Sequence, residues 1–474
     1  MPEFQLLVWA LVLFVFDAYR PQTKPRTLAW LGILGAALVL GATFVEPLTM
    51  GVGQYFHGLY SVDGLSIFFK QFFLVTLIVV LWMSAEFVEV LPLARNEFLL
   101  LPMLTTVGML LLASAVDFTT MFVALELVTI SFYVLVAYQR NRSASLEAGV
   151  KYLIIGALST GFLVYGIAFL YGNAGSTSFA TILETLSTNP LNLSILFAMA
   201  LILVGLCFKI SAVPFHIWAP DVYQGAPTPV TAFLAVGSKA AGFVVLLRLV
   251  FFSCFGNPVV APYVSSLLAV LAGVTVILGT FAALPQRNLK RLLGYSSIGH
   301  AGFILMALSC LSPRGVNAVL IYLISYLLAG LLAFFLITVV SKQVEGEELV
   351  NFSGLSKRSP LAAFGLTVAF VSMAGIPPLL GFAGKLGVLA AAWEAQRYVL
   401  VGIGVIAAAV GLYYYLSIVR YMYWNEAADG TAAVKLSCSA KWLVWLLVAG
   451  VIVFGIYQMP IATVVDQVLL GRNW

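Results

Sequence analysis

The stretches LIIGALSTGFLVYGIAFL (residues 153–170) and SSLLAVLAGVTVILGTFAAL (residues 265–284) decide the fold class of this chain. Neither stretch contains a charged residue, and neither alternates between apolar and polar positions as the strands of a membrane barrel do. About 20 consecutive apolar residues form an α-helix that is long enough to cross the hydrocarbon core of a bilayer. Such a helix also satisfies its backbone hydrogen bonds within one segment, as lipid requires. Both stretches therefore predict membrane-spanning α-helices.

The composition of the whole chain gives the same answer. Of its 474 residues, 62% are hydrophobic and only 9% are charged, whereas a soluble domain has about 25% charged residues. The net charge of +5 does not indicate nucleic-acid binding, because the basic residues fall mostly in loops between apolar runs. The cysteines (Cys207, Cys254, Cys310 and Cys438) have no CxxC or metal-ligand spacing and are interpreted as small apolar side chains.

Apolar runs between polar breaks predict fourteen spans. The first seven cover residues 2–19, 27–46, 64–85, 97–115, 117–138, 147–171 and 192–217. The other seven cover residues 227–253, 258–284, 289–311, 315–340, 360–393, 398–424 and 441–470. The first run is interpreted as a retained span, since no small-residue cleavage site follows it.

Lysine and arginine residues are unevenly divided between the two sets of loops. Three fall on one side (Arg314, Arg397 and Arg472) and fifteen on the other. Because positive loops stay in the cytoplasm, we expect a multi-pass protein of a bacterial inner (plasma) membrane with both termini on the outer side. The fifteen are Arg20, Lys24, Arg26, Arg95, Arg140, Arg142, Arg287, Lys290, Arg291, Lys342, Lys357, Arg358, Arg420, Lys435 and Lys441.

Two of the predicted spans are too long and contain proline in their interior. Residues 192–224 and 360–395 would each be about 50 Å long as straight helices. The sequences AVPFH (212–216) and GIPP (375–378) interrupt their helical hydrogen bonding. Broken helices at matching places in two halves indicate an internally repeated transporter with its ion path at the breaks. The alternative is that prolines are simply common in membrane helices.

The spacing of the two breaks predicts the repeat unit. They lie five spans apart, and an odd number of spans per unit inverts the second copy relative to the first. We therefore expect an all-α membrane protein of about 14 transmembrane helices, with two inverted five-helix repeats that each contain a broken helix. The predicted domains are residues 1–96 (spans 1–3), 97–254 (spans 4–8), 255–424 (spans 9–13) and 425–474 (span 14).

Ionisable side chains inside the spans are the candidates for function. A charge at the bilayer centre costs about 2.5–3.5 kcal/mol, so such groups must be paired, hydrated or neutral. Burial disfavours the ammonium form of a lysine and a nearby carboxylate restores it, so a buried lysine can exchange its proton near neutral pH. Several amines with one carboxylate and one imidazole, on different helices, are what a proton relay needs. The candidates are Glu126, Lys151, Lys209, Lys239, His300 and Lys385.

The lysines beside the helix breaks are the strongest of these candidates. Lys209 is five residues before Pro214, and Lys385 is seven residues after Pro378. Both lie too deep in their spans to reach an interface by extending the side chain. Lys239 lies about 15 Å into its own span.

The other ionisable residues have stronger alternatives. Glu126 is the only carboxylate near the middle of a predicted span. Lys151 lies about a turn into its span and could reach the cytoplasmic interface, and a hydrogen-bonded structural role is the usual alternative for His300. Lys70 and Arg248 are expected to reach the outer interface.

The chain lacks the motifs of a cofactor-binding enzyme. It has no Walker A, HExxH or CxxCH sequence, and the Gly-x-Gly sequences at 51–53 and 402–404 lack the strand, third glycine and helix of a dinucleotide site. The sequence therefore predicts no nucleotide, flavin, haem, cluster or metal site in this chain.

Three motifs in chain order resemble a known family. They are FKISAVPFHIWAPDVYQGAPTPV (208–230), NLKRLLGYSSIGH (288–300) and AGIPPLLGFAGK (374–385). They are similar to the proton-translocating, antiporter-like subunits of respiratory complex I, the NADH–quinone oxidoreductase. Among these paralogues the chain looks most like subunit N (subunit 2 in mitochondria, B in chloroplasts). A lysine at position 385 fits subunit N better than the paralogue that has glutamate at this position.

The resemblance implies a role for each candidate. In that family a fifth-span glutamate pairs with a seventh-span lysine, and charge passes through eighth-span and tenth-span groups to a twelfth-span residue. The residues that fall on these positions are Glu126, Lys209, Lys239, His300 and Lys385, and Lys151 matches a sixth-span lysine typical of subunit N.

The resemblance also implies partners. Proton translocation would be driven by quinone reduction elsewhere in the complex, so NADH, FMN, iron–sulfur clusters and quinone are expected in partner subunits and no cofactor in this chain. The expected neighbours are other membrane subunits of complex I, including other antiporter-like subunits, and the lipid bilayer.

Two other functions remain open at this point. A subunit of a cation/proton antiporter complex, or of a membrane-bound hydrogenase, could be built from the same helices. Sodium transport without NADH or quinone would favour it. A structural membrane anchor would instead keep pumping intact when Lys209 is neutralised.

Overall fold

The computed structural model describes residues 1–20, 22–91, 95–188, 193–254, 260–344, 346–427 and 433–470, without the side chains of 186–188, 251–254, 469 and 470. Arg472 and the side chain of Cys254 therefore lie outside the description. Most described residues are helical, and the only sheet among them is one two-stranded hairpin. The prediction of an all-α protein is confirmed.

The chain forms two compact units. The first contains Met1–Trp218, Gly225–Leu268 and the end of the last helix from Asp466, and the second contains Ala219–Gln224 and Ala269–Val465. The boundary between the units falls inside helix α12, and most of the short helix α9 belongs to the second unit.

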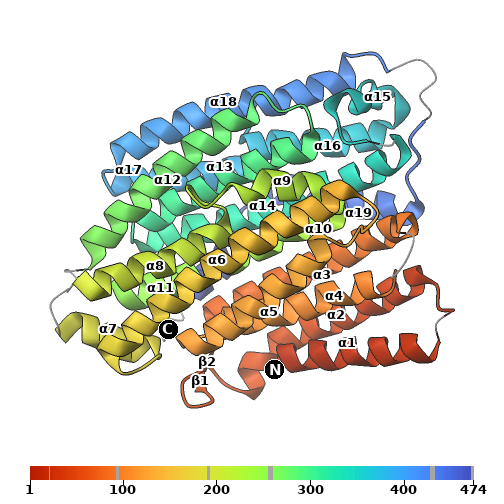
Figure 1. The fold of residues 1–474 in the computed structure, drawn as a ribbon. Helices are drawn as coiled ribbons and strands as arrows, with labels where there is room; N and C mark the ends of the chain where they lie inside the picture. The colour runs from red at the N-terminus through yellow and green to blue at the C-terminus, as the bar shows by residue number, and fades with distance from the viewer. Residues whose placement is uncertain are drawn as a thin grey trace. The chain divides into compact units, whose positions relative to one another are not determined.

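The first unit holds the N-terminal helices and the hairpin. Its elements are α1 (Pro2–Tyr19), α2 (Pro25–Thr49), β1 (Gly53–Tyr55), β2 (Tyr60–Val62), α3 (Gly64–Phe87), η1 (Val88–Val90), α4 (Glu97–Ser114), α5 (Phe118–Val136), α6 (Ser143–Ala174), α7 (Phe179–Thr188), α8 (Leu193–Ile210), α10 (Thr228–Phe233), η2 (Leu234–Ser238) and α11 (Lys239–Cys254). Neighbouring long helices pack side by side from α1 through α6 to α8 (Figure 1).

The second unit begins within α12 and ends within α20. Its elements are α9 (Trp218–Gly225), α12 (Ala261–Ala283), α13 (Leu289–Ser309), α14 (Pro313–Val344), η3 (Leu349–Phe352), α15 (Leu355–Arg358), α16 (Pro360–Ala374), α17 (Leu380–Glu394), α18 (Tyr398–Tyr423), α19 (Cys438–Ile456) and α20 (Met459–Leu470). Helix α14 lies against α13, α16, α17 and α19.

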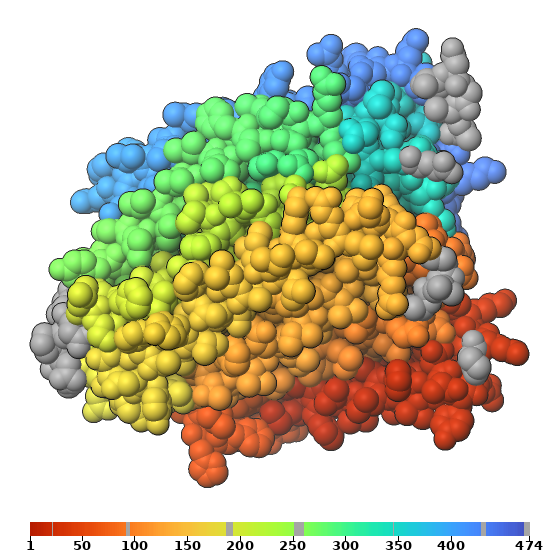
Figure 2. Space-filling model, in the orientation of Figure 1, coloured from red at the N-terminus to blue at the C-terminus, as the bar shows by residue number. Residues whose placement is uncertain are grey.

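Thirteen helices in the described part of the chain are long and apolar enough to cross a membrane. The remaining predicted span consists of two shorter pieces, α16 and α17, so thirteen helices and one broken pair account for the fourteen. The outward side of α6, drawn amber in Figure 2, exposes apolar side chains such as Val150, Ile154 and Leu158. A continuous apolar surface of this kind suits lipid and not water.

Both predicted helix breaks are confirmed. Helix α8 ends at Ile210, and Ser211 follows with φ +60°. The indole of Trp218 donates a 3.1 Å hydrogen bond to the carbonyl of Phe208, one of the carbonyls that lose their helical partner at the break. In the second unit α16 ends at Ala374, and Gly375 adopts φ +88°, a left-handed helix end that favours glycine.

The C-terminal span differs from the prediction of one helix over residues 441–470. Helix α19 ends at Ile456 and α20 begins at Met459. Pro460 explains the difference, because it has no backbone N–H to donate to the carbonyl of Ile456, whereas it is tolerated in the first turn of a new helix. Helix α7 and the β1–β2 hairpin were not predicted.

The two ends of the described chain lie at the same end of the first unit (Figure 1). Glu3 contacts Tyr60 of the hairpin, and a Cβ added to Gly64 would lie 3.0 Å from the Cα of Val468. An even number of membrane crossings requires this arrangement.

Candidate functional site

Lys209 is buried at the end of α8, one residue before the helix breaks. Its side chain is 2% exposed, and Nζ donates a 3.0 Å hydrogen bond to Oγ1 of Thr129 on α5. Nζ also lies 6.0 Å from the centroid of the Phe132 ring. Gly242 lets α11 approach closely, since a Cβ there would be 3.3 Å from Cγ of Lys209. The ammonium is thus held between α5 and the break.

Glu126 lies one turn before Thr129 on the same helix. The side chain is half-buried, and Oε1 accepts a 2.9 Å hydrogen bond from Thr160 of α6. In the part of the chain that the structure describes, no ion pair joins Glu126 to Lys209. The direct contact implied by the family resemblance is therefore absent, because the carboxylate turns towards α6 while Thr129 receives the amine.

Lys239 directly follows an irregular turn that the sequence did not reveal. The five residues of η2 form a π-helix, and Lys239 is the first residue of α11 after it. Such single π-helical turns are frequently found at functional sites. The side chain of Lys239 is 2% exposed. A π-turn has no composition of its own, so the sequence offered no signal for it.

Lys151 has a different environment from the other lysine candidates. Its side chain on α6 is 42% exposed and pairs at 2.7 Å with Glu147, one turn earlier on the same helix. An exposed pair at this spacing contributes only about 0.3–0.5 kcal/mol. The structure therefore places Lys151 at the surface of the first unit, and a role in a relay stays a prediction.

His300 in the second unit is buried between tyrosines. Its Nδ1 lies 2.7 Å from the hydroxyl of Tyr322 on α14, and its Nε2 lies 3.0 Å from the hydroxyl of Tyr415 on α18. A neutral imidazole donates from one nitrogen and accepts at the other, so the ring can connect the two phenols. The ring of Tyr326 lies 4.9 Å from that of His300. These tyrosines were not predicted from the sequence, although the four-residue spacing of Tyr322 and Tyr326 places both on one face of a helix.

Lys385 is buried beside the second helix break. Its Nζ donates a 2.9 Å hydrogen bond to the carbonyl of Ala374, the last residue of α16, and lies 5.4 Å from the ring centroid of Phe303. The carbonyl end of a helix carries partial negative charge and favours an ammonium group. A Cβ added to Gly375 would lie 2.8 Å from Cδ of Lys385, so the lysine stem needs glycine at this position.

A small cavity joins His300 and Lys385. The cavity has a volume of about 10 Å³, which is close to the minimum that one water molecule needs. Both candidates of the second unit therefore border the same space. The lining residues are His300, Tyr322, Ser325, Tyr326, Ala329, Ser372, Met373, Gly381 and Lys385.

Lys70 and Arg248 do not reach an interface, so that prediction was wrong. The Lys70 side chain is fully buried, with Nζ 3.2 Å from Glu3 and 3.0 Å from Glu46. Arg248 is equally buried and donates to both carboxylate oxygens of Asp63, at 3.0 and 3.1 Å. Carboxylates from other elements compensate both cations, which lets these charges stay away from water.

The described residues contain no group of three His, Cys, Asp or Glu side chains that could hold a metal ion. The first unit has a pocket of about 170 Å³ between α6, α7, α8, α11 and α12. Its lining is almost entirely apolar and includes none of the candidate residues.

Comparison with known proteins identifies the family. Residues 115–411 match the model of the NADH:quinone oxidoreductase/Mrp antiporter transmembrane family. The chain belongs to this family. The matched region contains all six candidate residues and both helix breaks.

Relatives are similar over nearly their whole length. The chain is 39% identical to NADH-quinone oxidoreductase subunit N of Heliobacterium modesticaldum, covering 94% of this chain and 93% of the relative. It is 41% identical to subunit N of Desulfitobacterium hafniense, covering 97% and 95%. A chain in the structure of respiratory complex I from Thermus thermophilus with bound aureothin aligns with a TM-score of 0.82 and 32% identity, covering 98% of this chain and 99% of that one.

Proposed function

We propose that this chain is the proton-translocating membrane subunit N of a multi-subunit NADH–quinone oxidoreductase and performs no redox chemistry itself. One observation carries the proposal. In a chain that matches a subunit N relative over 94% of its length, buried lysines lie beside each of the two helix breaks, and a third follows a π-turn. Buried ammonium groups at such irregular points are costly in a membrane and mark ion paths by default.

In the first unit we assign proton exchange to Glu126, Thr129 and Lys209. The Thr129 hydroxyl accepts a hydrogen bond from Lys209 and donates one to the Leu125 carbonyl. A hydroxyl can exchange donor and acceptor roles by rotation. Rotation of this hydroxyl, or closer approach of Glu126, would change how strongly Lys209 retains its proton. Lys239 would continue the relay.

In the second unit we assign proton exchange to Lys385 and His300. A water in the cavity between them would accept a proton from Nζ of Lys385. The Tyr322 hydroxyl, which also lines the cavity, would take a proton from this water and give its own to Nδ1 of His300. Nε2 would then pass a proton to the Tyr415 hydroxyl, which releases its own in turn. The Ala374 carbonyl stabilises the ammonium form before release.

The driving reaction belongs to other subunits in this proposal. Quinone reduction supplies the free energy, and NADH, FMN, the iron–sulfur clusters and quinone are bound by partners. The other antiporter-like subunits and the bilayer are the neighbours of this chain. Residues 97–254 and 255–424 act as the two transport repeats, flanked by residues 1–96 and 425–474.

The loop charges support an orientation in a bacterial inner membrane. The side with Arg142 and Lys342 would face the cytoplasm. Both termini would then face outward.

Proton transport by the intact complex in lipid vesicles tests the proposal. Lys209→Met should reduce the number of protons moved per NADH oxidised while all subunits still assemble. Lys342→Met, at an exposed lysine, is the control and should leave that ratio unchanged. Full pumping by Lys209→Met would show that the chain is an anchor.

A second function is supported by the family itself, which includes Mrp antiporters. The chain would then belong to a cation/proton antiporter complex or a membrane-bound hydrogenase. Sodium–proton exchange by the purified complex, in the absence of NADH and quinone, would favour this function over the first.

A further inference from the structure

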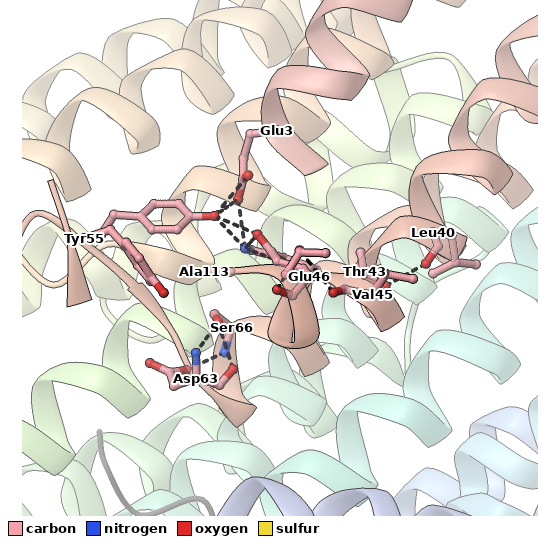
Figure 3. A network of polar contacts seen from close by, with 12 residues as sticks. Glu3, Leu40, Thr43, Val45, Glu46, Tyr55, Asp63, Ser66 and Ala113 are labelled. Atoms are coloured by element: carbon pink, nitrogen blue, oxygen red, sulfur yellow. Dashed lines mark hydrogen bonds and ion pairs between the residues drawn. The ribbon is translucent and has the colours of Figure 1, made fainter. Parts of the chain in front are cut away.

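A second group of buried charges lies outside the region that matches the family model. It consists of Glu3 on α1, Glu46 on α2, Tyr60 on β2 and Lys70 on α3, and is called the N-terminal cluster below. None of the four side chains is more than 4% exposed. Figure 3 shows the carboxylates of Glu3 and Glu46 converging from two different helices.

The Lys70 ammonium and the Tyr60 hydroxyl hold the two carboxylates together. Nζ lies 3.2 Å from Oε1 of Glu3, 3.0 and 3.1 Å from the oxygens of Glu46, and 2.7 Å from the Tyr60 hydroxyl. The same hydroxyl lies 3.0 and 3.1 Å from the oxygens of Glu3 and 3.3 Å from Oε1 of Glu46. Every polar atom of the cluster thus faces the others.

The charges of the N-terminal cluster do not balance when both carboxylates are ionised. Two carboxylates and one ammonium leave one uncompensated negative charge away from water, which is unfavourable. The neighbouring Asp63–Arg248 ion pair is neutral as a whole. The remaining charges on α1, α2, α3, η1 and α4 lie near their opposite ends, at Asp17, Arg26, Glu86, Glu89 and Glu97. Helix α20, which approaches the start of α3, carries Asp466. The amino group of Met1 forms no ion pair with either carboxylate in the described part of the chain, and His57 lies exposed on the hairpin.

The hydrogen bonds also lack one donor. Tyr60 has a single hydroxyl proton but lies within hydrogen-bond distance of both carboxylates. Burial, with the two carboxylates, raises the pKa of Tyr60 above its usual value, so the phenol keeps that proton. If Tyr60 donates to Glu3, a proton on Glu46 would turn the 3.3 Å contact between Glu46 and the phenol into a further hydrogen bond. The phenol oxygen has two lone pairs, which can accept from Lys70 and from a protonated Glu46.

The helix ends favour the same assignment. Glu3 lies in the first turn of α1, where the partial positive charge of the helix stabilises a carboxylate. Glu46 lies in the last turn of α2, where the partial negative charge disfavours one.

We propose that the N-terminal cluster is a proton-binding site in which Glu3 and Glu46 together hold one exchangeable proton, carried mainly by Glu46. A metal cation does not fit, because the Lys70 ammonium already occupies the position between the carboxylates. The site lies beside the hairpin, at the N-terminal end of α1 and the C-terminal end of α2, so the aqueous phase at that end is its proton source. This inference does not depend on the proposed function.

Infrared difference spectroscopy of the full-length chain in lipid tests the site. A protonated carboxyl has a C=O stretching band that shifts in D2O. The wild-type cluster should contribute one such band. Glu46→Gln and Glu3→Gln should each abolish it, because the remaining carboxylate and Lys70 form a neutral ion pair.

Removing the ammonium should have the opposite effect. Lys70→Met leaves two carboxylates with no cation, so both should be protonated and the signal should double. The double variant Glu46→Gln/Lys70→Met should restore one band, carried by Glu3, which tests the charge balance even if Lys70→Met alone fails to fold. Glu147→Gln, at an exposed carboxylate on α6, is the control and should change nothing in this region.

The proposal fails if the wild-type spectrum loses no carboxylic-acid band in Glu46→Gln and Glu3→Gln. It also fails if the double variant shows no band. Either result would mean that both carboxylates are ionised and that the N-terminal cluster is only a structural ion pair.

Discussion

Lys209 Nζ donates its hydrogen bond to Thr129, one helical turn beyond the carboxylate of Glu126 on α5. The threonine hydroxyl in turn donates a 2.7 Å hydrogen bond to the carbonyl of Leu125. A neutral side chain therefore holds the amine near the carboxylate without direct contact. Glu126 attracts the ammonium form of Lys209, and this attraction can compete with transfer of the Lys209 proton to another acceptor.

Thr129→Val should slow proton pumping about tenfold, which corresponds to about 1.4 kcal/mol. The loss reflects a hydrogen bond to a charged group, worth about 1.5–3 kcal/mol. Proton uptake by vesicles containing the complex measures it. Thr105→Val is a matched control, because Thr105 is equally buried and donates to the carbonyl of Leu101 in the same way. Equal effects of the two substitutions would remove Thr129 from the mechanism.

Glu126→Gln and Lys209→Met should each abolish most pumping, since each leaves the other group without its counter-charge. The double variant should be little worse than either single one, because the two residues act as one unit. The same vesicle assay on all four combinations gives the coupling. Additive losses would show that the two residues work independently.

Lys385→Arg should restore little of the pumping that Lys385→Ala loses. A guanidinium keeps its proton in proteins, so it can replace the charge but cannot exchange a proton with the cavity. Assembly should persist in both variants, as judged by co-purification of partner subunits. Full pumping by Lys385→Arg would mean that residue 385 supplies only a fixed charge.

Asp63→Asn should destabilise the chain at neutral pH and weaken its acid sensitivity. Burial alone would raise the pKa of Asp63, but the Arg248 guanidinium and further hydrogen bonds hold it below the usual value. A carboxyl whose pKa is lower in the folded state stabilises it above about pH 4 and loses this effect as pH falls further. Breaking a buried pair costs about 3–5 kcal/mol. Thermal unfolding of the purified chain between pH 7 and pH 3 measures both effects.

Glu394→Gln is the comparison for Asp63→Asn. Glu394 pairs with Arg314 at the surface, where both side chains are more than half exposed, so its loss should change stability little. Equal stability of wild type and Asp63→Asn at pH 7 would contradict the assigned role of the Asp63–Arg248 pair.

Cysteine labelling of intact cells should place Arg142 in the cytoplasm and Arg314 outside. Both positions are exposed, so a membrane-impermeant maleimide should react with Arg314→Cys but not with Arg142→Cys. Lys290 is unsuitable, because its side chain is buried against Glu347. Reaction at residue 142 from outside would reverse the proposed orientation.

The sequence predicted the spans and the two breaks because both follow from local chemistry. Apolar length determines a membrane helix, and Pro214 and Pro377 remove backbone donors wherever the helices pack. The deep positions of Lys209 and Lys385 follow directly from their distance to these prolines. The break between α19 and α20 was not predicted, because the apolar run continues past Pro460.

Contacts between distant helices could not be read in this way. The partners of His300 come from α14 and α18, and their approach depends on how three helices are staggered. Glu3 and Glu46 looked like ordinary residues near helix ends, since nothing local shows that both ends meet at Lys70. Thr129 was missed because a membrane threonine normally bonds to its own helix, which it also does here.

The approach of Gly64 to Val468 has a consequence for the biogenesis of the chain. Helix α3 leaves the ribosome well before α20, the helix that covers its N-terminal end. Roughly 400 residues separate them, which takes roughly 20–80 s at the usual elongation rate of 5–20 residues per second. During that interval the start of α3 has no covering helix from this chain. The first unit therefore begins to fold before the second but is completed only after α20 has been made.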